Sequence, residues 1–410
     1  MAGIALADDA WPRFRGPGGQ GVSAQSVPVE LHAGNQAWSA DLPGPGSSSP
    51  VVWGNRLFVT AEDREKGEIY LVAFDAGTGR RLWMRTETVG EYHLHRFNNT
   101  AAATPCLTDE FVIFAWYDAA RAAVMLSAYT HGGQRAWERN LGPWKGQHGP
   151  SENVVAAGGK VIVPHLHMGG GYVGAFAVND GAPLWQVEYP GGSKTTYATP
   201  LIRKVGRDAS RHEVVISGTS IGVWALDLET GKKNWTLPGI FPQRTIVSPV
   251  EIFRDPDTGA SLIQVGCKSG NFFAVRPPPA SGKKGSVAWK IEKHDPYVPN
   301  PVSDGKTLYV LSDGGVLTAV EARTGARRWQ ENLEANFYAS PLLVGGHLYC
   351  LSREGEMQVA EVAPKFKLLA RTDLQPGDEV EWTDATPAVA NGSLYVRLGA
   401  RLDCYRTPQP

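Results

Sequence analysis

A pair of residues, Ser, Thr or Asn followed by Pro, opens an apolar segment seven times along the chain. These pairs are Ser49-Pro50, Thr104-Pro105, Thr199-Pro200, Ser248-Pro249, Asn300-Pro301, Ser340-Pro341 and Thr386-Pro387. Asn153-Val154 supplies an eighth mark, because the residues after it match those after Ser49-Pro50. Successive marks lie 40 to 55 residues apart, which is room for four short strands and their turns. The sequence therefore predicts eight copies of one four-stranded unit.

A tryptophan recurs at one place in most of these units. In the first unit, the tight turn Asp75-Ala76-Gly77-Thr78-Gly79 precedes Trp83. A single blade cannot bury its own faces, so an indole repeated once per unit is expected to wedge between neighbouring sheets. The unit that starts at Pro341 departs from the pattern, with Lys367-Leu368-Leu369 where the tryptophan is expected. Together these features predict an all-β fold, a single eight-bladed β-propeller with four-stranded antiparallel blades over residues 35–410.

The two ends of the chain complement each other. The last unit reaches only its third strand, Leu402–Tyr405, before the chain ends, and the segment Gln36–Leu42 carries a spare tryptophan, Trp38. We expect this segment to complete the last blade and close the ring, which removes an exposed sheet edge. Residues 11–34 form an N-terminal extension. Residues 1–10 end an apolar stretch in Ala5-Leu6-Ala7 and resemble the remnant of a secretory signal, which predicts a periplasmic or secreted protein.

Composition excludes two classes of partner. The formal net charge is -1, without the basic stripe that nucleic acid requires. No run of eighteen apolar residues is present, so membrane insertion is not expected. The four cysteines, Cys106, Cys267, Cys350 and Cys404, are far apart in apolar stretches, and they predict buried thiols and not a disulfide framework.

The repeat resembles the PQQ-like propeller repeat that quinoprotein dehydrogenases share with the outer-membrane assembly lipoprotein BamB. The resemblance covers the chain from about Trp38 to Arg406. The opening Trp11-Pro12-Arg13-Phe14-Arg15-Gly16-Pro17 is similar to the start of secreted bacterial PQQ-like repeat proteins, most of which have no assigned activity. Quinone-dependent members carry two adjacent cysteines over the cofactor and are longer. No two cysteines are neighbours here, so the resemblance does not extend to bound PQQ.

Histidines gather on loops that the repeat places at one face. His93 and His95 precede the second blade, His148 precedes the third, and His165 and His167 follow the second strand of the third. Neutral imidazoles are common metal ligands. His95, His148 and His167 are therefore predicted to share a divalent metal ion, and ordinary solvated histidines are the alternative.

Other polar residues are predicted around the mouth of the central channel. His148, Tyr197 and Arg244 are the candidate catalytic residues, with a histidine or tyrosine as base and the arginine stabilising charge beside a uronate carboxylate. The candidate substrate-binding residues are Asn98, Asn99, Gln147, Lys268, Tyr297, Asp313, Tyr338 and Arg353. Aromatic faces stack on sugar rings and arginine binds carboxylates, whereas a wet polar funnel without a ligand is the alternative.

Two classes of function follow. The first is a lyase-type or hydrolase-type enzyme that acts on an oligosaccharide or related polar small molecule, with or without a metal. The second is a non-catalytic BamB-like scaffold that holds a protein partner. The gathering of basic imidazoles on one face favours the enzyme, because a scaffold does not need them.

Overall fold

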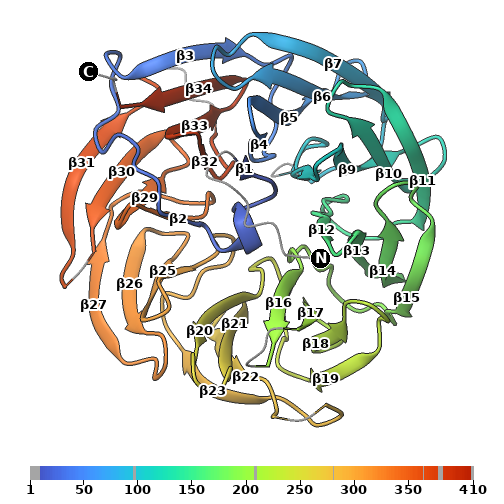
Figure 1. Cartoon of the computed structure of the whole chain (residues 1–410), viewed down its shortest axis with the longest axis vertical. Helices are drawn as coiled ribbons and strands as arrows, with labels where there is room; N and C mark the ends of the chain where they lie inside the picture. Colours follow the sequence, from blue (N-terminus) through green and yellow to red (C-terminus); the bar gives the residue numbers. More distant parts are fainter. Residues whose placement is uncertain are drawn as a thin grey trace.

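The computed structural model describes residues 10–95, 98–206, 210–279, 281–362, 364–376 and 382–407. These residues form eight β-sheets, arranged as blades around a central channel (Figure 1). The predicted eight-bladed all-β propeller is confirmed. Within the described residues, no helix is long and apolar enough to cross a membrane. The predicted signal remnant, apart from Ala10, lies outside the described residues.

The first four blades follow one another in chain order. Blade 1 contains β4 (Val51–Trp53), β5 (Arg56–Asp63), β6 (Glu68–Asp75) and β7 (Arg81–Thr88). Blade 2 contains β8 (Cys106–Leu107), β9 (Phe111–Asp118), β10 (Ala123–Thr130) and β11 (Arg135–Pro143). Blade 3 contains β12 (Val155–Ala157), β13 (Lys160–His167), β14 (Gly170–Ala177) and β15 (Pro183–Glu188). Blade 4 contains β16 (Leu201–Val205), β17 (Arg211–Gly218), β18 (Gly222–Asp227) and β19 (Lys233–Leu237).

The last four blades complete the ring. Blade 5 contains β20 (Val250–Arg254), β21 (Ser261–Cys267), β22 (Asn271–Arg276) and β23 (Ser286–Ile291). Blade 6 contains β24 (Val302–Ser303), β25 (Thr307–Leu311), β26 (Val316–Glu321) and β27 (Arg327–Asn332). Blade 7 contains β28 (Leu342–Val344), β29 (His347–Leu351), β30 (Glu356–Glu361) and β31 (Lys367–Asp373). Blade 8 contains β32 (Ala388–Ala390), β33 (Ser393–Leu398) and β34 (Arg401–Arg406), with β3 (Gln36–Asp41) antiparallel to β34 as its outermost strand.

The middle strands of each blade are buried on both faces. In β5 and β6 every residue between the two ends is buried, whereas the outermost strand β7 is mostly exposed or half-buried. Middle strands have a neighbouring blade against each face, so they tolerate continuous apolar sequence, as in buried strands generally. The core is therefore a set of apolar layers between blades, surrounding a polar channel.

Recurring tryptophans join one blade to the next at most boundaries, as predicted. Trp38 in β3 donates its Nε1–H to Ala76 O of blade 1 at 3.1 Å. Its ring lies over Gly79, where φ is 72° and an added Cβ would meet the indole at 2.6 Å. The same donation to the following blade occurs from Trp83, Trp137, Trp185 and Trp289. The turn glycine is thus required both for its backbone conformation and for the space above it.

Blade 7 lacks this tryptophan. In blade 6, Trp329 of β27 pairs with Ala319 of β26. At the equivalent position of blade 7, Ala370 of β31 pairs with Val359 of β30. The N-terminal extension packs here instead, since Val27 and Leu31 join the apolar cluster of blades 7, 8 and 1. Tyr349 donates to Val27 O at 3.3 Å. The extension therefore covers a boundary that has no indole.

The Ser, Thr and Asn residues that mark the repeats form a hydrogen-bonded belt around the channel. In six of the links the backbone N–H donates to the side chain of the counterpart in the next blade; for example, Thr199 N lies 2.9 Å from Ser248 Oγ. In the seventh link the side-chain Nδ2 of Asn153 donates to Thr199 Oγ1. We call these eight residues the polar belt: Ser49, Thr104, Asn153, Thr199, Ser248, Asn300, Ser340 and Thr386. Seven consecutive links join Ser49 through to Thr386. A residue that can accept a hydrogen bond is needed at each mark, which explains the restriction to three residue types.

Residues 10–23 lie inside the ring (Figure 1). β1 (Ala10–Trp11) pairs with β4, the 3-10 helix η1 (Pro17–Gly19) follows, and β2 (Val22–Ser23) lies parallel to β28. We call residues 10–23 the channel segment. It hydrogen-bonds to innermost strands on several sides of the channel, because such strands present unpaired backbone groups there.

Candidate functional site

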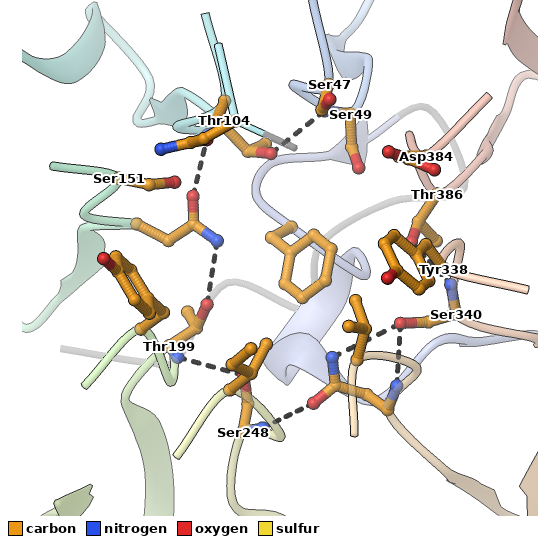
Figure 2. Close-up of a pocket in the computed structure, with 18 of the residues that line it drawn as sticks. Ser47, Ser49, Thr104, Ser151, Thr199, Ser248, Tyr338, Ser340, Asp384 and Thr386 are labelled. Carbon is orange, nitrogen blue, oxygen red and sulfur yellow. Dashed lines mark hydrogen bonds between the residues drawn. The ribbon is translucent and has the colours of Figure 1, made fainter. Parts of the chain in front are cut away.

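A cavity of about 250 Å³ occupies the central channel. Figure 2 shows its wall, where belt residues such as Thr199, Ser248 and Ser340 are joined by hydrogen bonds. All eight residues of the polar belt line the cavity, and so does Phe14 of the channel segment. Six predicted site residues line it as well: Asn98, His148, Tyr197, Arg244, Tyr297 and Tyr338. The predicted funnel therefore exists as one continuous space.

Arg244 is oriented by two neighbours. Its Nη1 donates to the hydroxyl of Tyr297 at 2.7 Å, and its Nη2 donates to Gln147 Oε1 at 2.8 Å. Its buried Nε has no partner among the described residues. Since an arginine stays charged and offers donors in a fixed fork, this guanidinium can still bind an acceptor from a ligand.

His148 lies against His95, with 4.1 Å between the ring centroids. Burial, followed by the positive charges of Arg244, His95 and Lys194, lowers the pKa of His148 to about 4. The imidazole is consequently neutral near pH 7 and can donate through one nitrogen while accepting through the other. Asn98 Nδ2 donates to His148 O and fixes the loop.

Tyr197 faces the same space in its un-ionised form. Its hydroxyl donates to Gly149 O at 3.0 Å. Burial raises the pKa of Tyr197 to about 12. The phenol is therefore a hydrogen-bonding group at neutral pH and not a ready base.

The wall around Tyr297 is held by a carboxylate and a lysine. Tyr297 N donates to Asp313 Oδ2 at 2.6 Å, and Lys268 Nζ lies 5.0 Å from the centre of the tyrosine ring. Burial raises the pKa of Asp313 above its usual value. Both residues position the tyrosine that contacts Arg244.

Arg353 is held between two aromatic rings at the rim. Its guanidinium carbon lies 3.9 Å from the ring centre of Tyr338 and 4.4 Å from that of Trp382. It also donates to both oxygens of Asp384, at 2.8 and 3.2 Å. Trp382 is 62% exposed. Such an indole, with one face on a cation and the other open, is available to stack on a ligand.

The remaining predicted ligand-binding residues lie one contact away from the cavity. Asn99 donates to Ser47 Oγ at 2.7 Å, and Ser47 is a lining residue. Gln147, Lys268, Asp313 and Arg353 touch lining residues in the ways given above. The structure thus places all eleven predicted residues in or next to one cavity.

The predicted metal ligands are not assembled. The structure brings His95 to His148, but His167 lies beside His165, with 4.9 Å between the ring centroids. Among the described residues, no three His, Cys, Asp or Glu side chains are grouped so that they could hold a metal ion. The sequence placed His165 and His167 in a loop, but β13 extends through His167 by pairing with β14, so both side chains are buried.

His165 is instead part of a buried polar pair. Its Nδ1 lies 2.8 Å from Glu152 Oε1 and its Nε2 lies 3.1 Å from Pro143 O. Burial alone would lower the pKa of His165, but the carboxylate and the carbonyl raise it above the usual value. Because both ring nitrogens face acceptors, this histidine serves the fold and not a metal.

Sequence reasoning missed the polar belt, Phe14, Asp384 and Trp382. The marks of the belt were visible as the repeat signal, but their role as a cavity wall follows only from the ring. Asp384 and Trp382 precede the last mark, in the place where other units carry their funnel residues. That position is the signal that could have found them.

The four cysteines are free and buried, as predicted. They belong to four different blades, 2, 5, 7 and 8. Burial raises the pKa of Cys106 to about 11. These residues do not fit the adjacent pair expected above bound PQQ.

Comparison with known proteins gives a consistent assignment. The family model described as outer membrane protein assembly factor BamB matches residues 21–115, 122–292 and 279–402. The protein of that name from Legionella pneumophila (strain Paris) is 22% identical over 220 residues, which are 53% of this chain and 50% of that protein. The chain thus spans about half the length of this curated relative.

Two solved structures share the fold. BamB from Moraxella catarrhalis has a TM-score of 0.61 at 15% identity, covering 92% of this chain and 98% of that one. The quinohemoprotein alcohol dehydrogenase from Comamonas testosteroni has a TM-score of 0.67 at 14% identity, covering 99% and 83%. At such identities the likeness concerns the propeller alone. The family model matches most of the chain, and the protein therefore belongs to the family of the outer membrane protein assembly factor BamB.

Proposed function

We propose that the funnel is a binding site for a small polar ligand that carries a carboxylate, such as an acidic sugar. The observation that supports this proposal is the convergence of Arg244, neutral His148 and Tyr197 on one cavity. Arginine pairs with carboxylates through charge-assisted hydrogen bonds, and the buried Nε of Arg244 has no partner among the described residues.

The size and lining of the cavity fit a small ligand. Sites for drug-sized molecules occupy about 300–1,000 Å³, and this cavity of about 250 Å³ lies just below that range. It accommodates one sugar unit, with the rest of a longer chain extending over the rim. Trp382 and Tyr338 offer aromatic faces there, and the belt offers hydroxyl groups below.

Turnover at this site requires a more basic His148. General bases work best with a pKa near the operating pH, whereas the pKa of His148 is about 4 and that of Tyr197 about 12. An anionic ligand beside Arg244 offsets the positive charge that depresses the pKa of His148. Ligand binding would thus prepare His148 to accept a proton, and a lyase-type or hydrolase-type activity on the bound acidic sugar is the enzymatic form of this proposal.

A second candidate function is the scaffold role. Its support is the family match along most of the chain and the name of the relatives, which are assembly factors for outer membrane proteins. Side chains for such contacts exist on the outermost strands, where Leu184, Val287 and Leu368 are exposed. We propose a periplasmic location on the same basis, and a protein partner would use the blade edges while the funnel binds its ligand.

Isothermal titration with acidic and neutral sugars tests the ligand proposal. Galacturonate should bind and galactose should bind at least tenfold more weakly, because only the acid engages Arg244. Arg244→Gln should lose this preference, and Arg276→Gln, which alters an exposed residue of β22, should keep it. If no acidic sugar binds and an outer membrane protein substrate is retained by the purified protein, the scaffold reading replaces the ligand-binding one.

A further inference from the structure

The polar belt has hydroxyl groups at the cavity wall that accept a hydrogen bond and have a hydrogen left to donate. Thr199 Oγ1 accepts from Asn153 Nδ2 at 2.9 Å, and Ser248 Oγ accepts from Thr199 N at 2.9 Å. Thr104, Ser340 and Thr386 likewise accept from a backbone N–H. Each hydroxyl has one hydrogen to donate, and within the described part of the chain none of these five donates it. All five line the cavity.

Two buried guanidinium groups lie next to the belt. Arg13 Nη2 donates to Pro200 O at 2.9 Å, and Arg15 Nη2 donates to Pro301 O. Pro200 and Pro301 directly follow the belt residues Thr199 and Asn300. Arg13 and Arg15 are 7% and 1% exposed. Phe14, between them in sequence, lines the cavity itself.

These guanidinium groups have no carboxylate partner. Of the ion pairs within the described ranges, none includes Arg13 or Arg15. Nε of both residues and Nη1 of Arg15 are buried without a hydrogen-bond partner in those ranges. Burial, together with the charge of Arg13, lowers the pKa of Arg15 to about 9. Buried charges in proteins are normally paired, so two unpaired cations in one segment call for a negative counterpart.

We propose that the channel binds a small anion at the level of the polar belt, above Phe14, held by belt hydroxyls and by the charge of Arg13 and Arg15. The ligand class is a halide or the carboxylate of a small molecule, since both accept several hydrogen bonds and neutralise the two cations. Water also accepts from the hydroxyls but leaves the charge uncompensated. The carboxylate of Asp384, the acidic group of the cavity wall, is already paired with Arg353, so it does not fill this role.

This anion site is separate from the ligand contacts proposed at Arg244. Its contacts come from the belt and the channel segment, and it does not depend on an acidic sugar binding above. The probe anions are bromide and acetate. Because acetate can also pair with Arg244, only a response that a charge introduced in the belt abolishes is assigned to this site. If the sugar titrations fail, the proposal of an anion site at the belt still stands. If the anion experiments fail, the proposal of an acidic-sugar site at Arg244 still stands.

Asn300→Asp is the sharpest variant. Asn300 Oδ1 accepts from Ser248 N, and Nδ2 lies 3.3 Å from Ser340 Oγ. An aspartate has the same shape, keeps the acceptor, and places a permanent negative charge next to the carbonyl that Arg15 binds. The carboxylate of this aspartate should supply the negative charge that the bound anion supplies in the wild type. Asn332→Asp is the matched control, because Asn332 is exposed and its Oδ1 also accepts a backbone N–H.

The experiment measures thermal unfolding at constant ionic strength while bromide or acetate replaces 1,3,6-naphthalenetrisulfonate, a rigid trianion too bulky to enter a cavity of about 250 Å³. The wild-type protein and Asn332→Asp should gain several degrees in a saturable manner. Asn300→Asp should melt at a temperature independent of the anion. An equal gain in all three proteins, or none in the wild type, overturns the proposal.

A second measurement does not depend on any variant folding. Wild-type crystals soaked in sodium bromide should show an anomalous peak inside the ring of belt hydroxyls, and sodium acetate in excess should abolish it. A response to bromide without competition by acetate assigns the site to halides. Bromide peaks confined to the outer surface contradict the proposal.

Discussion

Arg397 of blade 8 binds Ser48 of blade 1 at the junction where the described belt residues form no link. Its Nη1 lies 3.0 Å from Ser48 Oγ and 2.7 Å from Thr60 O. The side chain is 1% exposed. A buried arginine thus joins the last blade to the first, whereas serine, threonine and asparagine join the others.

Replacing Arg397 by methionine should weaken the whole ring. The variant leaves the carbonyls of Ser48 and Thr60 buried without these donors, and each such group costs about 1–3 kcal/mol. We expect the free energy of unfolding to fall by about 2–5 kcal/mol, measured by urea denaturation. The exposed-site variant Arg276→Met should lie within about 0.5 kcal/mol of the wild type. An unchanged urea midpoint for Arg397→Met would show that the junction does not depend on this contact.

Deleting residues 1–45 should open the propeller. The deletion removes β3, with the Trp38 contact to blade 1, and the channel segment with its bonds to innermost strands. An unpaired β34 then forms an exposed edge, which favours aggregation. We expect aggregation or a much lower melting temperature by light scattering and calorimetry, and deletion of residues 1–9 is the control. A monomeric product with unchanged thermal stability would refute ring closure by the N-terminal strand.

The periodicity of the sequence was sufficient for the architecture. Marks such as Thr199-Pro200 and tryptophans such as Trp83 recur with the blade, so the number of blades follows from local patterns. The channel segment was not predictable in this way, because Arg13 and Arg15 bond to carbonyls almost 200 and 300 residues away, and no local pattern encodes such contacts.

The site was predictable only in part for a related reason. Loop position placed His148, Tyr197 and Arg244 at one face, and the ring geometry then brought them together. The same reasoning failed for His167, since β13 continues through this residue whereas the sequence suggested a loop. A residue expected in a loop at the channel mouth is instead held in a strand, where pairing with β14 fixes it in the buried interior.

PQQ should not bind tightly, in contrast to the alcohol dehydrogenases that share the fold. The chain lacks adjacent cysteines, and its four thiols are buried in separate blades. Titration with PQQ and calcium, followed by calorimetry, should show no micromolar binding, and dye-linked oxidation of alcohols or aldoses should stay at background. Binding in the micromolar range accompanied by turnover would contradict this expectation.

The His165–Glu152 pair should make stability depend on pH. The pKa of His165 is raised in the folded state above the reference value of about 6.5. The resulting stabilisation is therefore fully present below about pH 6.5 and is lost as pH rises through the folded-state pKa. His165→Gln should destabilise the protein more at pH 6 than at pH 9 in urea denaturation. The control His347→Gln should show no such difference, and an equal loss at both pH values for His165→Gln would exclude the pair as its source.

Binding of an acidic sugar should tighten as pH falls from 7 to 5. The free funnel keeps the pKa of His148 at about 4, through burial and then the charges of Arg244, His95 and Lys194. A ligand carboxylate beside Arg244 offsets those charges and raises the pKa of His148 in the complex. A group whose pKa rises on binding takes up protons, so affinity increases as the pH approaches that value, by at most about tenfold per pH unit.

Titration calorimetry with galacturonate at pH 7, 6 and 5, in buffers of different ionisation enthalpy, measures both the affinity and the proton uptake. His148→Asn should bind with an affinity that changes little with pH and without proton uptake, because the amide does not titrate. His347→Asn keeps all funnel residues and should behave as the wild type does. If wild-type affinity is flat across this range while Arg244→Gln still abolishes binding, the carboxylate binds Arg244 without coupling to His148, and the proposed route to a basic imidazole is lost.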